Sequence, residues 1–98
     1  MGGQSDMTDG ASAETFAPYI GKAISLDGGP TLTLVAVDRH KSPTPGGAFT
    51  LVLRGAPAPI APEGMHRVTL EGGASFDLYL IPVHTVSRDH QDYQIVFN

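Results

Sequence analysis

With 98 residues, 41% of them hydrophobic and none of them cysteine, the chain has room for one domain and excludes disulfides, zinc–thiolate sites, iron–sulfur clusters and thiol catalysis. The formal charge is −4 and the six basic side chains are scattered along the chain, so the basic stripe that nucleic-acid binding requires is missing. No apolar run approaches the roughly 20 residues of a membrane-spanning helix.

The first residues differ in composition from the rest of the chain. Residues 1–13 are small and polar, and we expect them to form a flexible tail. They lack the basic start and apolar stretch of a signal peptide. Residues 14–98 are then predicted to form a single β domain. We expect a soluble protein in the cytoplasm, although it could be part of an assembled extracellular or phage-like particle.

A short helix is predicted directly after the tail. Ser12 lies where it could cap the first turn. Pro18 and Gly21 confine the helix to one or two turns. One face of this turn carries Phe16, Tyr19 and Ile20. The spacing predicts a short plug over one end of a sheet.

The remainder of the chain alternates apolar runs with turn signals. Strands are predicted over residues 22–26, 31–39, 48–54, 64–70, 75–83 and 92–97. Residues 41–47 read as a flexible loop, and residues 55–63, with three prolines, read as an extended connection. This spacing predicts an all-β fold, a small six-stranded antiparallel barrel or sandwich. It would be largely a meander, with a short N-terminal helical turn.

Alternate residues of a strand point to opposite faces, so the strands provide two sets of side chains. One set is strongly apolar and forms the predicted core: Leu32, Leu34, Ala36, Phe49, Leu51, Leu53, Val68, Leu70, Phe76, Leu78, Leu80, Tyr93, Ile95 and Phe97. The other set should be polar in a lone barrel. It nevertheless contains seven apolar residues, which are our interface candidates: Val35, Val37, Val52, Tyr79, Ile81, Val83 and Val96.

Three interpretations of these seven residues remain open. The Phe16–Ile20 segment or the proline-rich connection could cover them within the domain. They could form the interface of a homo- or hetero-oligomer. They could also line a ligand cleft.

No group of residues has the spacing of a catalytic site. The serines lack the strained turn of a nucleophile elbow, and no pair of carboxylates suggests an acid and a base. The glycine pairs lack the spacing of a phosphate-binding loop. We therefore predict no enzymatic activity, no catalytic residue and no cofactor.

We expect the histidines to have structural roles and not to bind a metal ion. His84 and His90 lie near Asp89 and Asp92 between the last two strands. Such groups could bind Zn²⁺, but their spacing fits no strong motif, so a hydrated loop is favoured and no metal site is predicted. His66 is in phase with the core residues of its strand, and we expect it at the edge of the core.

Three short sequence patterns stand out in the apolar segments. They are Phe-x-Pro-x-x-Gly at Phe16–Gly21, Phe-x-Leu-x-Leu-x-Pro-Val at Phe76–Val83 and Tyr-x-x-x-Phe-Asn at Tyr93–Asn98. With these patterns the chain resembles, from about Thr15 to Asn98, a family of small bacterial domains of unknown function. The resemblance implies an assembly or accessory role, because similar proteins are associated with gene neighbourhoods of phage-tail-collar-like proteins. It assigns no site residues.

These observations favour a non-enzymatic interaction or assembly module over an enzyme. The module would bind a protein partner, or itself, through the interface candidates or through an unpaired edge strand. It could be an accessory of a phage-tail-like or surface structure. The alternative is a small-molecule or carbohydrate-binding β-barrel with Tyr79 and His66 near the mouth of a pocket.

Overall fold

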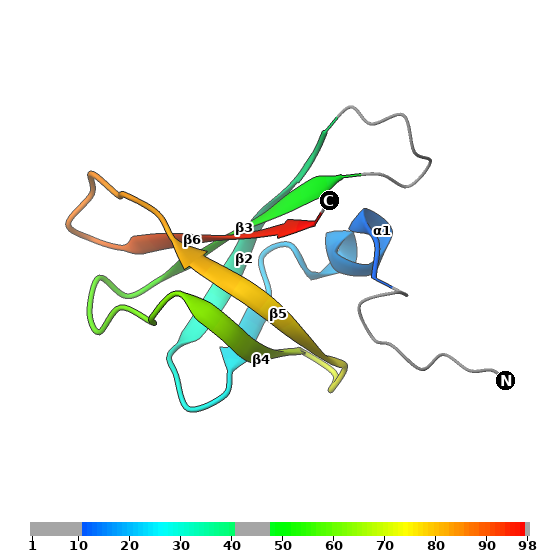
Figure 1. Ribbon diagram of the computed structural model, residues 1–98, viewed down its shortest axis with the longest axis horizontal. Helices are drawn as coiled ribbons and strands as arrows, with labels where there is room; N and C mark the ends of the chain where they lie inside the picture. The colour runs from blue at the N-terminus through cyan, green and yellow to red at the C-terminus, as the bar shows by residue number, and fades with distance from the viewer. Residues whose placement is uncertain (1–10, 41–47, 98) are drawn as a thin grey trace, which may run out of the picture.

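The computed structural model describes residues 11–40 and 48–97. Within them, six antiparallel strands form one closed barrel (Figure 1). The elements are α1 (Ala13–Phe16), the 3₁₀ turn η1 (Ala17–Tyr19), β1 (Ala23–Leu26), β2 (Thr31–Arg39), β3 (Phe49–Gly55), β4 (Gly64–Leu70), β5 (Ser75–Pro82) and β6 (Gln91–Phe97). The predicted fold class is confirmed, in its barrel form. The first ten residues of the tail predicted over residues 1–13 and the loop predicted over residues 41–47 lie outside the described residues, as does Asn98.

The strands follow one another around the barrel in the order β1-β2-β3-β6-β5-β4. Each half of the chain forms a three-stranded meander, β1–β2–β3 and β4–β5–β6. Two further ladders, β3 with β6 and β1 with β4, join the halves. The proline-rich connection must therefore cross one end of the barrel between β3 and β4. None of the helices in the described ranges is long and apolar enough to cross a membrane.

Inward-pointing side chains from all six strands fill the barrel. The strand residues that are buried are Ile24, Leu26, Leu32, Leu34, Phe49, Leu51, Leu53, Val68, Leu70, Phe76, Leu78, Leu80, Tyr93 and Ile95. They include every predicted core residue except Ala36 and Phe97, and Phe97 packs against the core while partly exposed. The prediction omitted Ile24 and Leu26, because a strand of four residues is too short to show a clear alternation.

A β-bulge in β2 corrects the prediction for Ala36 and Val37. The ladder between β2 and β3 shifts its register between Leu34 and Ala36, so Val35 is an extra residue in the strand. One extra residue reverses the alternation of faces beyond it. Ala36 therefore lies on the outer face opposite Val52, whereas Val37 packs against the core.

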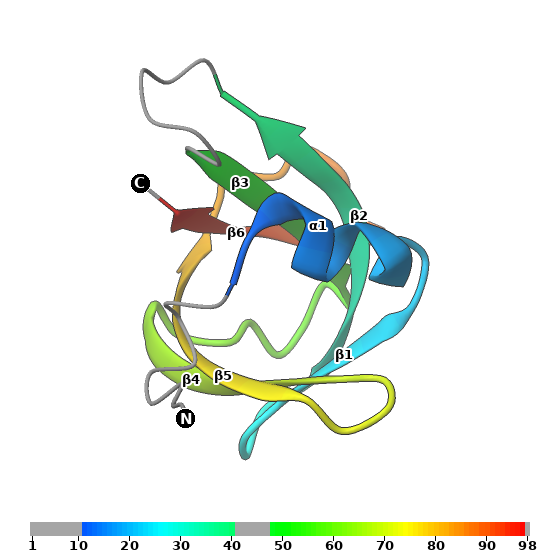
Figure 2. The same ribbon diagram turned by 90° about the vertical axis from the view of Figure 1, so that its right-hand side faces the viewer.

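The N-terminal helical turn lies across one end of the barrel (Figure 2). Phe16 is fully buried, and its ring centroid lies 6.1 Å from that of Phe49, 5.4 Å from that of Phe76 and 5.5 Å from that of Phe97. Such separations are typical of aromatic side chains in contact. The predicted plug is thus confirmed for Phe16. It is wrong for Ile20, which is exposed because the backbone becomes extended there.

The helical turn begins where the sequence indicates. The main-chain N–H of Ser12 donates a hydrogen bond to Oγ1 of Thr15, at 3.0 Å. Ala13 is buried and Ala11 packs against the core. The domain boundary predicted at residue 14 therefore falls inside the packed unit.

Candidate interaction surface

Four neighbouring strands bring distant residues into one row on the outer surface. Val52 of β3 lies opposite Ala36 of β2 on one side and opposite Gln94 of β6 on the other. Gln94 in turn lies opposite Ile81 of β5. Two of the interface candidates, Val52 and Ile81, are therefore separated by a single strand, although they lie far apart in the sequence.

Three more exposed apolar side chains lie on the same strands or on the next one. Val96 of β6 is 44% exposed, Tyr79 of β5 is 47% exposed and Met65 of β4, opposite Tyr79, is 63% exposed. Met65 was missed by the sequence analysis, although its alternation with Val68 places it in the outer set. We call Val52, Met65, Tyr79, Ile81 and Val96 the apolar face.

The other three interface candidates lie elsewhere. Val37 points to the core side of the barrel wall. Val35 is the half-buried extra residue of the bulge. Val83 follows the end of β5, and its main-chain N–H donates to the carbonyl oxygen of Asp92 at 3.0 Å. The structure thus brings together only part of the predicted set.

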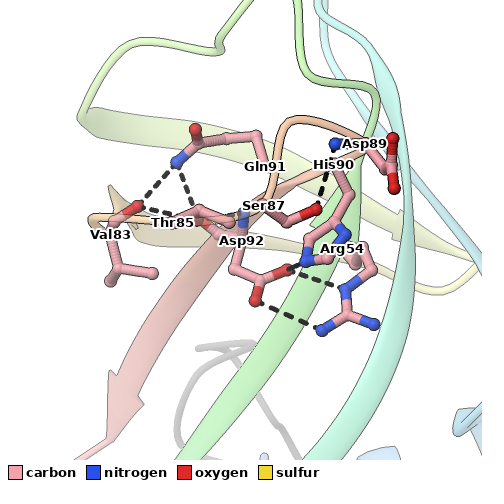
Figure 3. Close-up of polar contacts among 8 residues, drawn as sticks. All are labelled: Arg54, Val83, Thr85, Ser87, Asp89, His90, Gln91 and Asp92. Carbon is pink, nitrogen blue, oxygen red and sulfur yellow. Dashed lines mark hydrogen bonds and ion pairs between the residues drawn. The ribbon is translucent and has the colours of Figure 1, made fainter.

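Ion pairs lie beside the apolar face. Arg54 Nε donates to Asp92 Oδ1 at 2.8 Å and Arg54 Nη2 donates to Oδ2 at 3.3 Å (Figure 3). This hydrogen bonding lowers the pKa of Asp92 and raises the pKa of Arg54. Arg67 and Asp77 form a second pair at 3.2 Å. In these two pairs each charge faces its opposite.

Tyr79 is held at its hydroxyl end. The hydroxyl donates to Glu63 Oε2 at 2.8 Å. This hydrogen bond raises the pKa of Tyr79, because only the protonated phenol can donate it, and desolvation and the nearby negative charge of Glu63 act in the same direction. The ring is thereby linked to the connection that precedes β4.

His66 lies on the other side of the barrel wall from Tyr79. It is opposite Leu78 in the β4–β5 ladder, one position away from the Met65–Tyr79 pair, and successive side chains point to opposite faces. Its Nε2 donates to the carbonyl oxygen of Pro62 at 2.8 Å. The expected place at the core edge is confirmed, but Tyr79 and His66 do not share one pocket mouth.

The segment between β5 and β6 uses its polar groups for turn contacts (Figure 3). The main-chain N–H of Asp92 donates to Thr85 Oγ1, and that of Asp89 donates to Ser87 Oγ, both at 3.0 Å. His90 Nε2 lies 3.6 Å from Asp92 Oδ1, a carboxylate that Arg54 already binds. Across residues 11–40 and 48–97, no three His, Asp or Glu side chains, those of His84 and His90 included, are placed to hold a metal ion.

Comparison with known proteins finds one match, and it covers the barrel together with its N-terminal turn. No curated protein and no solved structure matches the chain. One family model matches residues 11–97, and its description is a domain of unknown function, DUF6916. The match extends from the residues before α1 to the end of β6, which confirms the resemblance to a family of small domains of unknown function. The chain therefore belongs to the DUF6916 family.

Proposed function

We propose that this domain is a non-enzymatic protein-interaction or assembly module that binds a protein partner, or a second copy, through the apolar face. The supporting observation is that Met65, Tyr79 and Val96 remain about half exposed outside a barrel that already has a contiguous core. Apolar side chains gathered on a folded domain are typical of an interaction site. An accessory role in a phage-tail-like or surface structure is one form of this proposal and rests on the family resemblance.

The barrel interior favours this function over the binding of a small molecule inside. An eight-stranded barrel is just wide enough for side chains to fill it, and six strands enclose less space. The inward side chains of Leu34, Leu80 and Tyr93 are fully buried. Because these side chains occupy the interior, the outer surface is the better place for a partner.

In the part of the chain that the structure describes, the N-terminal plug lies at the end of the barrel. Phe16 packs among three phenylalanines at the barrel end rather than over Val52 and Ile81. From the connection between β3 and β4, Glu63 accepts a hydrogen bond from the hydroxyl of Tyr79. These placements support an interface between molecules over a cover within the domain.

Light scattering over a range of concentrations tests the proposal with the variants Val52→Asp and Ile81→Asp. We expect the average mass of the unmodified protein to rise above 10.3 kDa with concentration. Either variant should keep the monomer mass, because association would bury an unpaired carboxylate. Thr31→Asp is the matched control, since Thr31 is exposed in β2, away from the apolar face, and this variant should associate normally.

Thermal melting followed by circular dichroism accompanies the measurement. Both aspartate variants should remain folded at the temperature of the scattering experiment. A protein that stays monomeric at every concentration, together with marked destabilisation of both variants, would show that these side chains serve the fold alone. That result would contradict the proposal.

A further inference from the structure

The connection between β5 and β6 presents an apolar side chain to solvent. Val86 is 89% exposed, the largest exposed fraction among the large apolar side chains in residues 11–40 and 48–97. The connection projects from the end of the barrel opposite α1 (Figure 1). A single exposed valine is common on a protein surface, so its significance depends on what surrounds it.

Hydrogen bonds hold the residues on both sides of Val86. Thr85 Oγ1 accepts a hydrogen bond from the main-chain N–H of Asp92 at 3.0 Å. Ser87 Oγ accepts one from the main-chain N–H of Asp89, also at 3.0 Å (Figure 3). A segment that is already held in one conformation loses little conformational entropy when it binds. The connection therefore presents Val86 as a preorganised contact.

Arg88 adds a positive charge to the same connection. Within the described ranges it is the one lysine or arginine without an ion pair, whereas a carboxylate lies beside each of the others: Lys22, Arg39, Arg54 and Arg67. Val86 and Arg88 are two positions apart, so their Cα atoms lie at most about 7 Å apart. The connection can therefore place an apolar contact and a charge on one small patch of a partner.

The apolar face has a corner with the complementary properties. Met65 and Tyr79 lie opposite each other in the β4–β5 ladder, and both are exposed. The Glu63 carboxylate accepts the hydrogen bond of the Tyr79 hydroxyl at 2.8 Å. Glu63 has no ion pair among the residues that the structure describes, and its carboxylate can accept further hydrogen bonds. Exposed apolar side chains therefore lie beside an unpaired negative charge.

We propose that the β5–β6 connection of one copy docks on the Met65–Tyr79 pair of a second copy. Val86 packs against these two side chains, and Arg88 pairs with Glu63. This inference rests on the proposed function and names a second copy as the partner of the apolar face. A guanidinium can donate to a carboxylate and lie on an aromatic ring at the same time, and arginine and tyrosine are enriched among the residues that dominate interface energies.

Charge argues for a second copy. The formal charge of −4 makes two copies repel each other at long range, so self-association gains from a local pair of opposite charges. Arg88 and Glu63 provide that pair, and they do not pair with each other within one copy. They belong to different surfaces of the chain. Each copy can therefore give its connection to one neighbour and receive that of another, or two copies can exchange connections in a two-fold dimer.

Charge reversal tests the proposed pair. Glu63→Arg and Arg88→Glu each place like charges at the contact, and each should weaken self-association by about tenfold or more in sedimentation equilibrium. Glu63→Arg also makes the net charge of the chain less negative, so a general charge effect would strengthen association instead. Val86→Ser should weaken association as well, because it removes the apolar contact.

Mixing the two variants provides a rescue. A copy with Glu63→Arg keeps Arg88, and a copy with Arg88→Glu keeps Glu63, so an equimolar mixture should associate although neither variant does so alone. The double variant Glu63→Arg/Arg88→Glu should associate with itself, because the two reversed charges again attract each other. Loss of folding in either single variant could not produce this recovery.

An exposed ion pair at the other end of the barrel supplies matched controls. Lys22 lies 3.8 Å from Glu71, and Glu71→Arg and Lys22→Glu make the same changes of net charge as the two test variants. Both controls should associate like the unmodified protein. Asp89→Asn should not weaken association either, because the carboxylate next to Arg88 has no attractive role in the contact.

Several results would overturn the inference. If Val52→Asp abolishes association but Glu63→Arg or Arg88→Glu associates normally, the apolar face meets another part of the second copy, and the proposed function stands without this contact. Failure of both the mixture and the double variant to recover association has the same meaning. An unmodified protein that is monomeric at every concentration also overturns the inference, and if Val52→Asp is then as stable as the unmodified protein, the apolar face is left to a different protein.

Discussion

The hydroxyl oxygen of Tyr93 accepts a hydrogen bond from the main-chain N–H of Ala61, at 3.0 Å, and both residues are buried. Tyr93 belongs to β6, whereas Ala61 lies 32 positions earlier, in the proline-rich connection between β3 and β4. A buried amide without a partner would cost free energy. The phenol therefore fixes the connection to the barrel while its ring fills the core.

Replacement of this phenol tests its role. Tyr93→Phe should lower the free energy of unfolding by about 1–2 kcal/mol, because the buried N–H of Ala61 loses its acceptor. Urea denaturation measures the loss, and hydrogen exchange of the Ala61 amide should become faster. Tyr79→Phe is the matched control, since that hydroxyl is exposed, and its effect should be smaller. Equal effects of the two variants would contradict a structural role for the Tyr93–Ala61 bond.

Phe16 should be a major contributor to stability although it lies outside the strands. Phe16→Ala should reduce the free energy of unfolding by about 3–5 kcal/mol, because it leaves a cavity among three other phenylalanine rings. Phe16→Leu should cost less than half as much. Ile20→Ala, at an exposed position of the same segment, should change stability little. A small effect of Phe16→Ala in urea denaturation would mean that the barrel end closes without it.

Gly55, at the end of β3, should not tolerate a side chain. A Cβ atom at this position would lie 2.5 Å from Cδ2 of Leu32, which is itself buried. Gly55→Ala should therefore destabilise the domain by about 1–3 kcal/mol in thermal or urea unfolding. Gly29→Ala is the control, because its Cβ would meet Leu26 at an ordinary 3.4 Å. If the clash is the cause, Leu32→Ala should partly relieve the cost of Gly55→Ala.

The ion pair between Arg54 and Asp92 should make stability depend on acidity. Its hydrogen bonds lower the pKa of Asp92 in the folded state, so the stabilisation is present above the unfolded-state pKa and is lost as the pH falls through the folded-state pKa. The stability difference between the unmodified protein and Asp92→Asn should therefore be largest near neutral pH. It should shrink below a pH of about 4. A difference that stays constant from neutral pH to pH 2 in urea denaturation would contradict this assignment.

Alternation in the sequence was sufficient to predict the inner face wherever a strand is regular. Leu51 and Leu53 of β3 face Ile95 and Tyr93 of β6 in an unbroken register, and all four were predicted to be buried. Alternation failed to predict the faces at the bulge, where Val35 is an extra residue and reverses the faces of Ala36 and Val37. No glycine or proline marks this position, so a local change of backbone geometry had no sequence signal.

The surface was harder to predict than the core, because alternation gives the face of a residue but not its neighbours. Val52 and Ile81 lie one strand apart only because β3 and β5 both lie beside β6, and that order depends on how the proline-rich connection crosses the barrel. Neither distance nor order around a barrel follows from the periodicity of a single chain.

The pairing of the two meanders has a consequence for how fast the domain folds. The ladders that close the barrel join Ile24 to Leu70 and Leu51 to Ile95, so each closure must order a long stretch of chain before its contacts contribute. The connections between successive strands within each half span far fewer residues, at most those between Arg39 and Phe49. We therefore expect the meeting of the halves to limit the rate, with folding in the range of milliseconds to seconds that non-local β pairing imposes.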